Sequence, residues 1–287
     1  MKKLLVLCCA IAAPFASLAD DIDLEKKELV LDVRRIGLDL SKTQLRHVDQ
    51  YVNSPITALN TDGQDYIKGA FDTVLEYTKN RFNWDNGLLM EYGKTTLYPH
   101  NAPKTVNENA DKILFTSNLS YACWDFDSFK LGPTMRVAYE TEFEPAQGTD
   151  NRLKVTRGSA GISLFDSDII KSLYVAGMYE YDFTYGHDQV SKFAVETGWR
   201  LEYLIREGVK LSTDGYYREY LSYSNYVGTD LERDLSVTAR MDTNLWGAFT
   251  MGPYVQYRRA KARDAENYGS NLMIGISFNY INKFGLR

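Results

Sequence analysis

Large apolar residues alternate with small or polar ones along much of this chain. Residues 172 to 186, "SLYVAGMYEYDFTYG", put Leu173, Val175 and Tyr179 on one side of an extended strand. Ala176 and Glu180 fall on the other side, because successive side chains of a strand point to opposite faces. The stretch therefore predicts a strand with one apolar, aromatic face and one small or charged face.

The same period-two pattern recurs and predicts about twelve strands. We expect strands near residues 28–41, 66–79, 84–97, 113–124, 129–143, 153–165, 172–186, 193–203, 209–220, 235–245, 249–258 and 271–280. Two of these segments, 28–41 and 153–165, change phase or contain too much glycine for their faces to be assigned.

The connections between these strands alternate in length. Long ones are expected at 42–63, 98–110, 144–152, 186–191, 221–231 and 260–269, and short ones at 80–83, 125–128, 166–171, 205–207 and 245–246. An up-and-down barrel of the outer membrane has tight periplasmic turns and longer outer loops, and this is the pattern predicted here. The tryptophans Trp84, Trp124, Trp199 and Trp246 lie near the short connections, as an interfacial aromatic girdle requires.

The predicted fold class is all-β, an up-and-down antiparallel transmembrane β-barrel with the N-terminus in the periplasm. A soluble β-sandwich is the alternative, but it would have to bury the aromatic stripe and would not produce alternating loop lengths. The chain has 287 residues, 21 of them tyrosine, and a net charge of -5. No interior stretch approaches eighteen apolar residues, which excludes a helical membrane protein.

The N-terminus, "MKKLLVLCCAIAAPFASLAD", has the features of a secretory signal. Lys2 and Lys3 precede an apolar run, and Ser17 and Ala19 supply small residues for cleavage. We expect residues 1–19 to be removed and residues 20–287 to form one barrel domain. Cys123 is then the one cysteine left, so we expect no internal disulfide.

The segment "MIGISFNY" near the C-terminus places Gly275, Phe278 and Tyr280 in a glycine-x-x-aromatic-x-aromatic pattern. It resembles the last strand of Gram-negative outer-membrane β-barrel proteins, which the barrel-assembly machinery reads. Other stretches look like proteobacterial outer-membrane proteins without an assigned function. The resemblance implies the fold, a place in the cell outer membrane and contact with its lipid and lipopolysaccharide, but no substrate. This sequence departs from the pattern of the last strand at Met273 and in the seven residues expected to follow the strand.

Charged residues dominate the faces predicted to point inward. The candidate pore-lining residues are Lys68, Asp72, Glu76, Glu91, Arg136, Glu140, Glu180, Asp182, Glu196, Arg200, Glu202, Lys210, Asp214, Arg218, Arg240, Asp242 and Arg258, and Lys130, Glu142 and Asp234 fall on the same faces. Acids outnumber bases in this set, so a conducting pore would prefer cations. We expect a porin-like channel for a small solute or ion of unknown identity. The alternatives are a lumen plugged by its own salt bridges and a structural or adhesive barrel acting through its loops.

Enzymatic interpretations have less support in the sequence. The histidines, His47, His100 and His187, all fall in expected outer loops, so we expect no metal site and no cofactor. A surface lipid hydrolase would need a serine and histidine pair at the rim, for which His187 and Ser191 are the nearest candidates. No basic patch predicts nucleic-acid binding. The long loop 42–63 could fold inward and constrict the pore, or present a ligand site outside.

Overall fold

A computed structural model describes residues 28–51, 65–97, 105–126, 128–145, 150–186, 188–226, 228 and 230–286. The expected signal segment, residues 1–19, lies outside these ranges. In the described part of the chain, no helix is long and apolar enough to cross a membrane.

The described residues form thirteen strands and one short 3-10 helix. The elements are β1 (Leu29–Arg46), η2 (Val48–Tyr51), β2 (Asp65–Lys79), β3 (Phe82–Leu97), β4 (Thr105–Tyr121), β5 (Trp124–Phe126), β6 (Phe129–Thr141), β7 (Lys154–Phe165), β8 (Ile170–Asp182), β9 (Val190–Arg206), β10 (Val209–Tyr223), β11 (Leu231–Trp246), β12 (Phe249–Ala262) and β13 (Gly269–Gly285). All the long strands lie where the period-two pattern predicts them.

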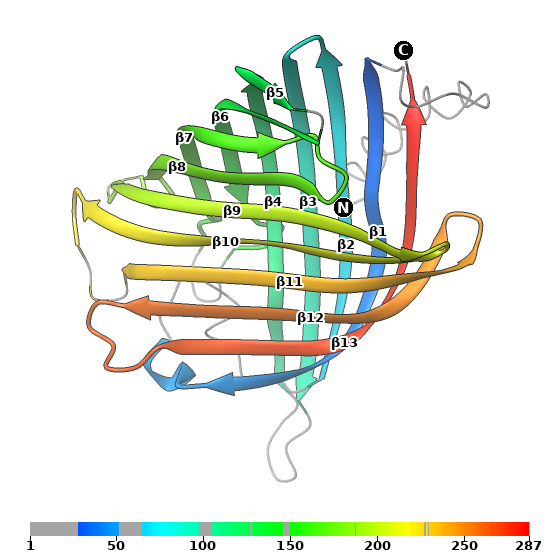
Figure 1. Ribbon diagram of the computed structural model, residues 1–287. Coiled ribbons are helices and arrows are strands. Elements are labelled where there is room, and N and C mark those ends of the chain that lie inside the picture. Colours follow the sequence, from blue (N-terminus) through cyan, green and yellow to red (C-terminus); the bar gives the residue numbers. More distant parts are fainter. Residues whose placement is uncertain are drawn as a thin grey trace.

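Twelve of these strands close into one antiparallel barrel. Sequence neighbours pair with each other, β4 pairs with β6, and β5 is a three-residue strand that pairs only with β6. The first and last strands close the ring, and their register runs from Val30 opposite Gly285 to Arg46 opposite Ser270. Figure 1 shows β1 and β13 side by side, with the other strands following in sequence order around the barrel. The predicted fold class is confirmed.

Tight turns gather at one end of the barrel, where β1 begins and β13 ends. Asn80 and Gly208 have φ angles of 53° and 74° in the turns β2–β3 and β9–β10, and Gly247 has 53° in the turn β11–β12. Asparagine and glycine tolerate this left-handed conformation, which other residues adopt only with strain. The longer connections lie at the opposite end, so the predicted alternation is confirmed. We call the two ends the short-turn end and the long-loop end.

The outer surface of the barrel is apolar and the inner surface is polar. On β8, Val175 and Tyr179 are 55% and 53% exposed, whereas Ala176 and Glu180 on the opposite face are buried, as the sequence pattern predicts. Ile162, Ile274 and many other large apolar side chains are exposed on the same outer surface. Such a band is stable only in contact with lipid, and a closed barrel leaves no strand edge unpaired there. The structure therefore has the architecture of an outer-membrane barrel, which places the protein in that membrane.

Several strand boundaries differ from those predicted. β1 continues to Arg46 and β4 starts at Thr105, so the loops expected at 42–63 and 98–110 are shorter than predicted. The expected turn at 125–128 contains part of β5. β13 continues to Gly285, so the residues after Tyr280 belong to the strand instead of following it. Pairing with β1 accounts for this last extension, because Leu31 and Asp32 lie opposite Phe284 and Lys283.

Candidate functional site

The charged interior of the barrel is the candidate site, and the predicted residues occupy its inward face. They do not form one cluster. Ion pairs and hydrogen bonds divide them into three networks, and a fourth group surrounds a cavity near the short-turn end. Asp182 stands apart, because at the end of β8 its carboxylate accepts a hydrogen bond from the backbone N–H of Thr184 at 3.0 Å.

The first network is centred on Arg157 of β7, which sequence analysis did not identify. Its guanidinium donates to the carboxylates of Glu140 on β6 and Glu180 on β8, and the Glu180 contact measures 2.6 Å. Lys192 of β9 lies 3.0 Å from the second carboxyl oxygen of Glu180, and Lys112 of β4 lies 3.8 Å from Glu140. Two acids thus share three bases. We call this group the Arg157 network.

The second network is centred on Arg218 of β10, which donates to the carboxylate of Glu196 on β9. The Tyr174 hydroxyl also donates to Glu196, at 2.5 Å, and in turn accepts from Arg136 at 3.0 Å. The Tyr174 ring lies against Gly198 of the neighbouring strand, which has no side chain to displace it. A Cβ atom there would lie 2.4 Å from the ring. We call this group the Arg218 network.

Aromatic contact extends the Arg218 network towards β12. The Arg218 guanidinium lies over the Tyr216 ring, 4.0 Å from its centre. The Tyr216 hydroxyl donates to Asp234 at 3.0 Å, and Arg258 donates to the same carboxylate at 2.8 Å. Asp234 is 1% exposed, so its charge is stabilised by these contacts in place of water.

The third network crosses the barrel seam between β1 and β13. Lys68 of β2 lies 2.6 Å from Glu91 of β3 and 3.6 Å from Asp39 of β1. Arg35 of β1 also donates to Asp39, and its Nε donates to the amide oxygen of Asn279 at 2.7 Å. We call this group the Lys68 network. Arg35 and Asp39 were not among the predicted inward residues, because a β-bulge between Val33 and Ile36 shifts the phase of β1.

Asn279 links the Lys68 network to β11. Its amide nitrogen donates to Asp242 at 3.0 Å, and Arg240 donates to the other oxygen of that carboxylate at 2.7 Å. Lys68, Asp39 and Asp242 are each at most 2% exposed. The interior at this level is therefore filled by paired charges of the protein itself.

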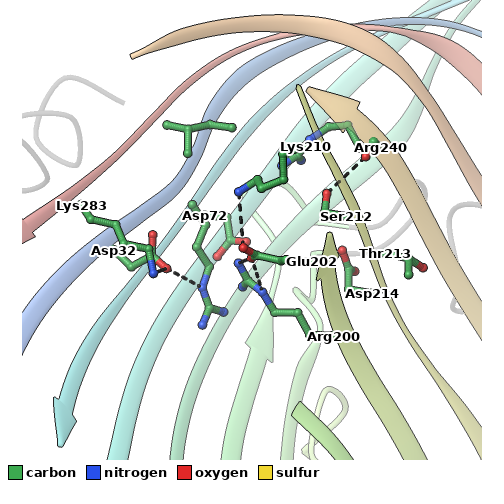
Figure 2. Close-up of a pocket in the computed structure, with 12 residues that line it drawn as sticks. Asp32, Asp72, Arg200, Glu202, Lys210, Ser212, Thr213, Asp214, Arg240 and Lys283 are labelled. Carbon is green, nitrogen blue, oxygen red and sulfur yellow. Dashed lines mark hydrogen bonds and ion pairs between the residues drawn. The ribbon is translucent and has the colours of Figure 1, made fainter. Parts of the chain in front are cut away.

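Near the short-turn end, the interior contains a cavity of about 50 Å³, enough for a few water molecules. We call it the charged chamber. Its lining includes Asp32, Arg34, Asp72, Arg200, Glu202, Lys210, Ser212, Asp214, Arg240 and Lys283. Figure 2 shows Arg200 and Lys210 pointing towards Glu202, at 2.6 and 3.4 Å, with Asp72 beside them.

Opposite charges pair on the far wall of the charged chamber as well. Lys283 lies 3.0 Å from Asp32, and Arg34 lies 3.4 Å from Glu76. Two acids differ from the rest: Asp72 and Asp214 have no basic group within 4.0 Å among the residues that the structure describes. Asp214 is also exposed although it points inward. A carboxylate in this position faces open space in the interior.

The first long loop reaches inward at the other end of the barrel. Tyr51 of η2 is 1% exposed and packs with Ala260 and Ala262, which point inward from β12. Its hydroxyl accepts from the backbone N–H of Ala262 at 3.2 Å and lies 2.9 Å from the carbonyl oxygen of Asn267. Residues 52–64, the rest of the loop for which a constriction and an outer ligand site were the two interpretations, lie outside the described residues.

The remaining candidates are the histidines and the serine that were considered for a metal site or a lipid hydrolase. His47 is exposed, whereas His100 and His187 lie outside the described residues. The Ser191 hydroxyl forms a 2.7 Å hydrogen bond with the Tyr179 hydroxyl on the outer surface. In the part of the chain that the structure describes, no group of three or more His, Cys, Asp or Glu side chains could hold a metal ion.

The proposed assembly signal contains two outward residues and one inward residue. Phe278 is 43% exposed on the lipid side, and Tyr280 follows it on the same face. Gly275 faces inward, where a Cβ atom would lie 2.1 Å from the carbonyl oxygen of Leu40. The glycine of the motif thus permits close contact between β13 and β1, which is the pair of strands that closes the barrel.

The chain has limited similarity to known proteins. A family model described as "Protein of unknown function (DUF3078)" matches residues 63–146. No curated protein matches the sequence. Among solved structures, an outer membrane phospholipase A from Escherichia coli, an active-site mutant, is 11% identical with a TM-score of 0.46, and the match covers 93% of this chain and 96% of that one.

Two further similar structures come from proteins of other kinds. An outer membrane channel from Pseudomonas putida F1 is 10% identical with a TM-score of 0.46, and the match covers 92% of this chain and all of that one (100%). The translocator domain of the autotransporter NalP from Neisseria meningitidis is 10% identical with a TM-score of 0.35, over 97% and 98% of the two chains. Their different functions are not transferable to this chain at such low similarity.

Proposed function

We propose that the protein is an outer-membrane channel for small cations or small positively charged solutes. The observation that carries this proposal is Asp214, an inward-pointing carboxylate that is exposed and has no basic partner within 4.0 Å among the described residues. Asp72 contributes a second such carboxylate to the charged chamber. Fixed acidic charge in a narrow, weakly screened passage attracts cations and repels anions.

The three networks limit what could pass. Their carboxylates are held by arginines and lysines, and their side chains fill the interior between the charged chamber and the long-loop end. Barrels of about eight strands are filled by side chains and those of about sixteen contain an aqueous channel, so twelve strands suit a narrow route. The proposed solutes are therefore small cations and compact positively charged molecules, not oligosaccharides or peptides.

Planar-bilayer recording on purified protein tests the proposal. We expect conductance with a reversal potential that shows a preference for cations, and we expect Asp72→Asn with Asp214→Asn to reduce that preference. Glu219→Gln is the matched control, because Glu219 is an acid on the outer face, paired with Arg233 at 3.1 Å. Absence of conductance at any voltage would refute the channel.

A non-conducting barrel is the second candidate function, and the paired interior favours it. Glu180, Glu196 and Asp234 are each at most 2% exposed, as expected for side chains that plug a lumen. In that case the protein would act through its long loops, as a structural or adhesive barrel. The same recordings distinguish the two, because a plugged barrel stays silent although it inserts into the bilayer.

A further inference from the structure

The outer surface of the barrel has a second cavity, at the long-loop end and on the lipid side of the seam. It measures about 320 Å³, and Arg46, His47, Tyr257, Arg259, Tyr268 and Ser270 are among its lining residues. Nothing in the proposed channel uses these side chains, since Arg46, Arg259 and Ser270 lie on the outward faces of their strands. We call this cavity the rim pocket.

Strand register places the two arginines of the rim pocket in one row. Arg259 of β12 lies opposite Ser270 of β13, and Ser270 lies opposite Arg46 of β1. Neighbouring strands are about 4.8 Å apart, so the two arginine backbones are separated by about 10 Å, with a serine hydroxyl between them. Two guanidinium groups and a hydroxyl on one face make a suitable frame for an anion with several oxygens.

The described residues supply no carboxylate that neutralises this row. Among the described residues, neither Arg46 nor Arg259 has an acidic group within 4.0 Å. Arg259 is held instead by the Tyr268 ring, with 4.2 Å from the guanidinium to the ring centre. The Tyr268 hydroxyl is fixed in turn by Arg233, which donates to it at 2.9 Å. The aromatic ring orients Arg259 and leaves its charge uncompensated.

The rim pocket lies where the apolar band ends. On the same three strands, closer to the short-turn end, the outward residues Leu40, Val255 and Ile274 are 43%, 38% and 55% exposed. These side chains belong to the hydrocarbon level of the membrane. A polar cavity directly beyond them is at the depth of lipid headgroups, where phosphate groups are the anions present in high concentration.

We propose that the rim pocket binds the phosphate group of a lipid in the leaflet around the long-loop end. Arg46 and Arg259 would donate charge-assisted hydrogen bonds to phosphate oxygens, for which the planar guanidinium is better suited than an ammonium group. The Ser270 hydroxyl would donate a further bond between them. Tyr257 would pack against the apolar part of the same lipid. The site would thus fix one phosphorylated lipid against the strands that close the barrel.

Native mass spectrometry of the purified full-length barrel in detergent, titrated with lipid A, tests the site. We expect bound lipid A, and we expect Arg46→Gln with Arg259→Gln to weaken binding by about tenfold or more, as the loss of two charge-assisted hydrogen bonds implies. Lys154→Gln is the matched control, an exposed base on β7 at the same end of the barrel but outside the pocket. It should bind lipid A like the unmodified protein.

Two further measurements identify which part of the lipid the rim pocket binds. Dephosphorylated lipid A should bind as weakly to the unmodified protein as lipid A binds to the double variant. Inorganic phosphate alone, at the same concentrations, should not displace lipid A, because the lipid also contributes its apolar contacts. Three outcomes would each overturn the proposal. They are equal binding of lipid A and dephosphorylated lipid A, equal binding of lipid A by the double variant and the Lys154→Gln control, and full displacement of lipid A by inorganic phosphate. The heat-dependent gel shift of the double variant verifies that it is folded.

Discussion

Arg157 lies between two acids and forms an ion pair with each of them. It bonds Glu140 and Glu180, and its side chain is only 13% exposed. Removing one partner of a buried ion pair leaves the other charge desolvated and uncompensated, which costs about 3 kcal/mol or more. We therefore expect Arg157→Met to lower the free energy of unfolding by at least that amount, measured by urea titration of the barrel in lipid vesicles.

An exposed pair provides the comparison for Arg157. Lys130 lies 2.5 Å from Asp166 near the short-turn end, where the Asp166 side chain is 59% exposed. Water and salt screen such a pair, so Lys130→Met should cost less than about 1 kcal/mol. Similar losses in the two variants would mean that the Arg157 network is hydrated in the membrane, and that the interior is more open than its burial indicates.

Residue types alone could not identify all of these partners. The inward face of β8 was predicted correctly because apolar and charged residues alternate there without interruption. Arg157 was missed because β7 contains Gly158 and Gly161 and its outward positions carry little apolar signal. Arg35 and Asp39 were missed for a different reason, since the bulge in β1 inverts the pattern partway along the strand. Side-chain pairing across the lumen depends on barrel closure, which local periodicity does not encode.

At the scale of elements, η2 is the part of the first loop that reaches the interior. Tyr51 fills the space beside Ala260 and Gly269, and a Cβ atom on Gly269 would lie 2.7 Å from the Tyr51 ring. If the pore conducts, Tyr51→Ala should increase single-channel conductance by opening the long-loop end. Gly269→Ala should have a similar effect, because it displaces the same ring without altering the loop sequence.

Tyr51→Phe is the control for this element. It keeps the ring in place and removes only the hydroxyl that contacts Ala262 and Asn267, so conductance should stay close to that of the unmodified protein. Unchanged conductance in both Tyr51→Ala and Gly269→Ala would show that η2 does not restrict the pore. The limiting constriction would then lie in the buried networks deeper inside the barrel.

At the scale of the whole molecule, the two ends of the barrel differ in the length of their connections. This difference predicts how the barrel is oriented in the membrane. The tight turns, the first residue of β1 (Leu29) and the last residue of β13 (Gly285) lie at the short-turn end. Trp84 and Trp246 are exposed there, at 46% and 66%, as expected for side chains at a membrane interface. Outer-membrane barrels direct their short turns to the periplasm, so the charged chamber would open towards the periplasm.

Epitope tags on whole cells test this orientation. Asp188 and Asn225 lie in connections at the long-loop end, whereas Glu207 and Gly208 form the turn between β9 and β10. Tags inserted at Asp188 or Asn225 should bind antibody on intact cells, and a tag at Glu207 should bind only after the outer membrane is permeabilised. Each tagged protein should keep its heat-dependent gel shift, which verifies that the barrel has formed. Surface labelling at Glu207 alone would reverse the orientation, and with it the expected direction of entry into the charged chamber.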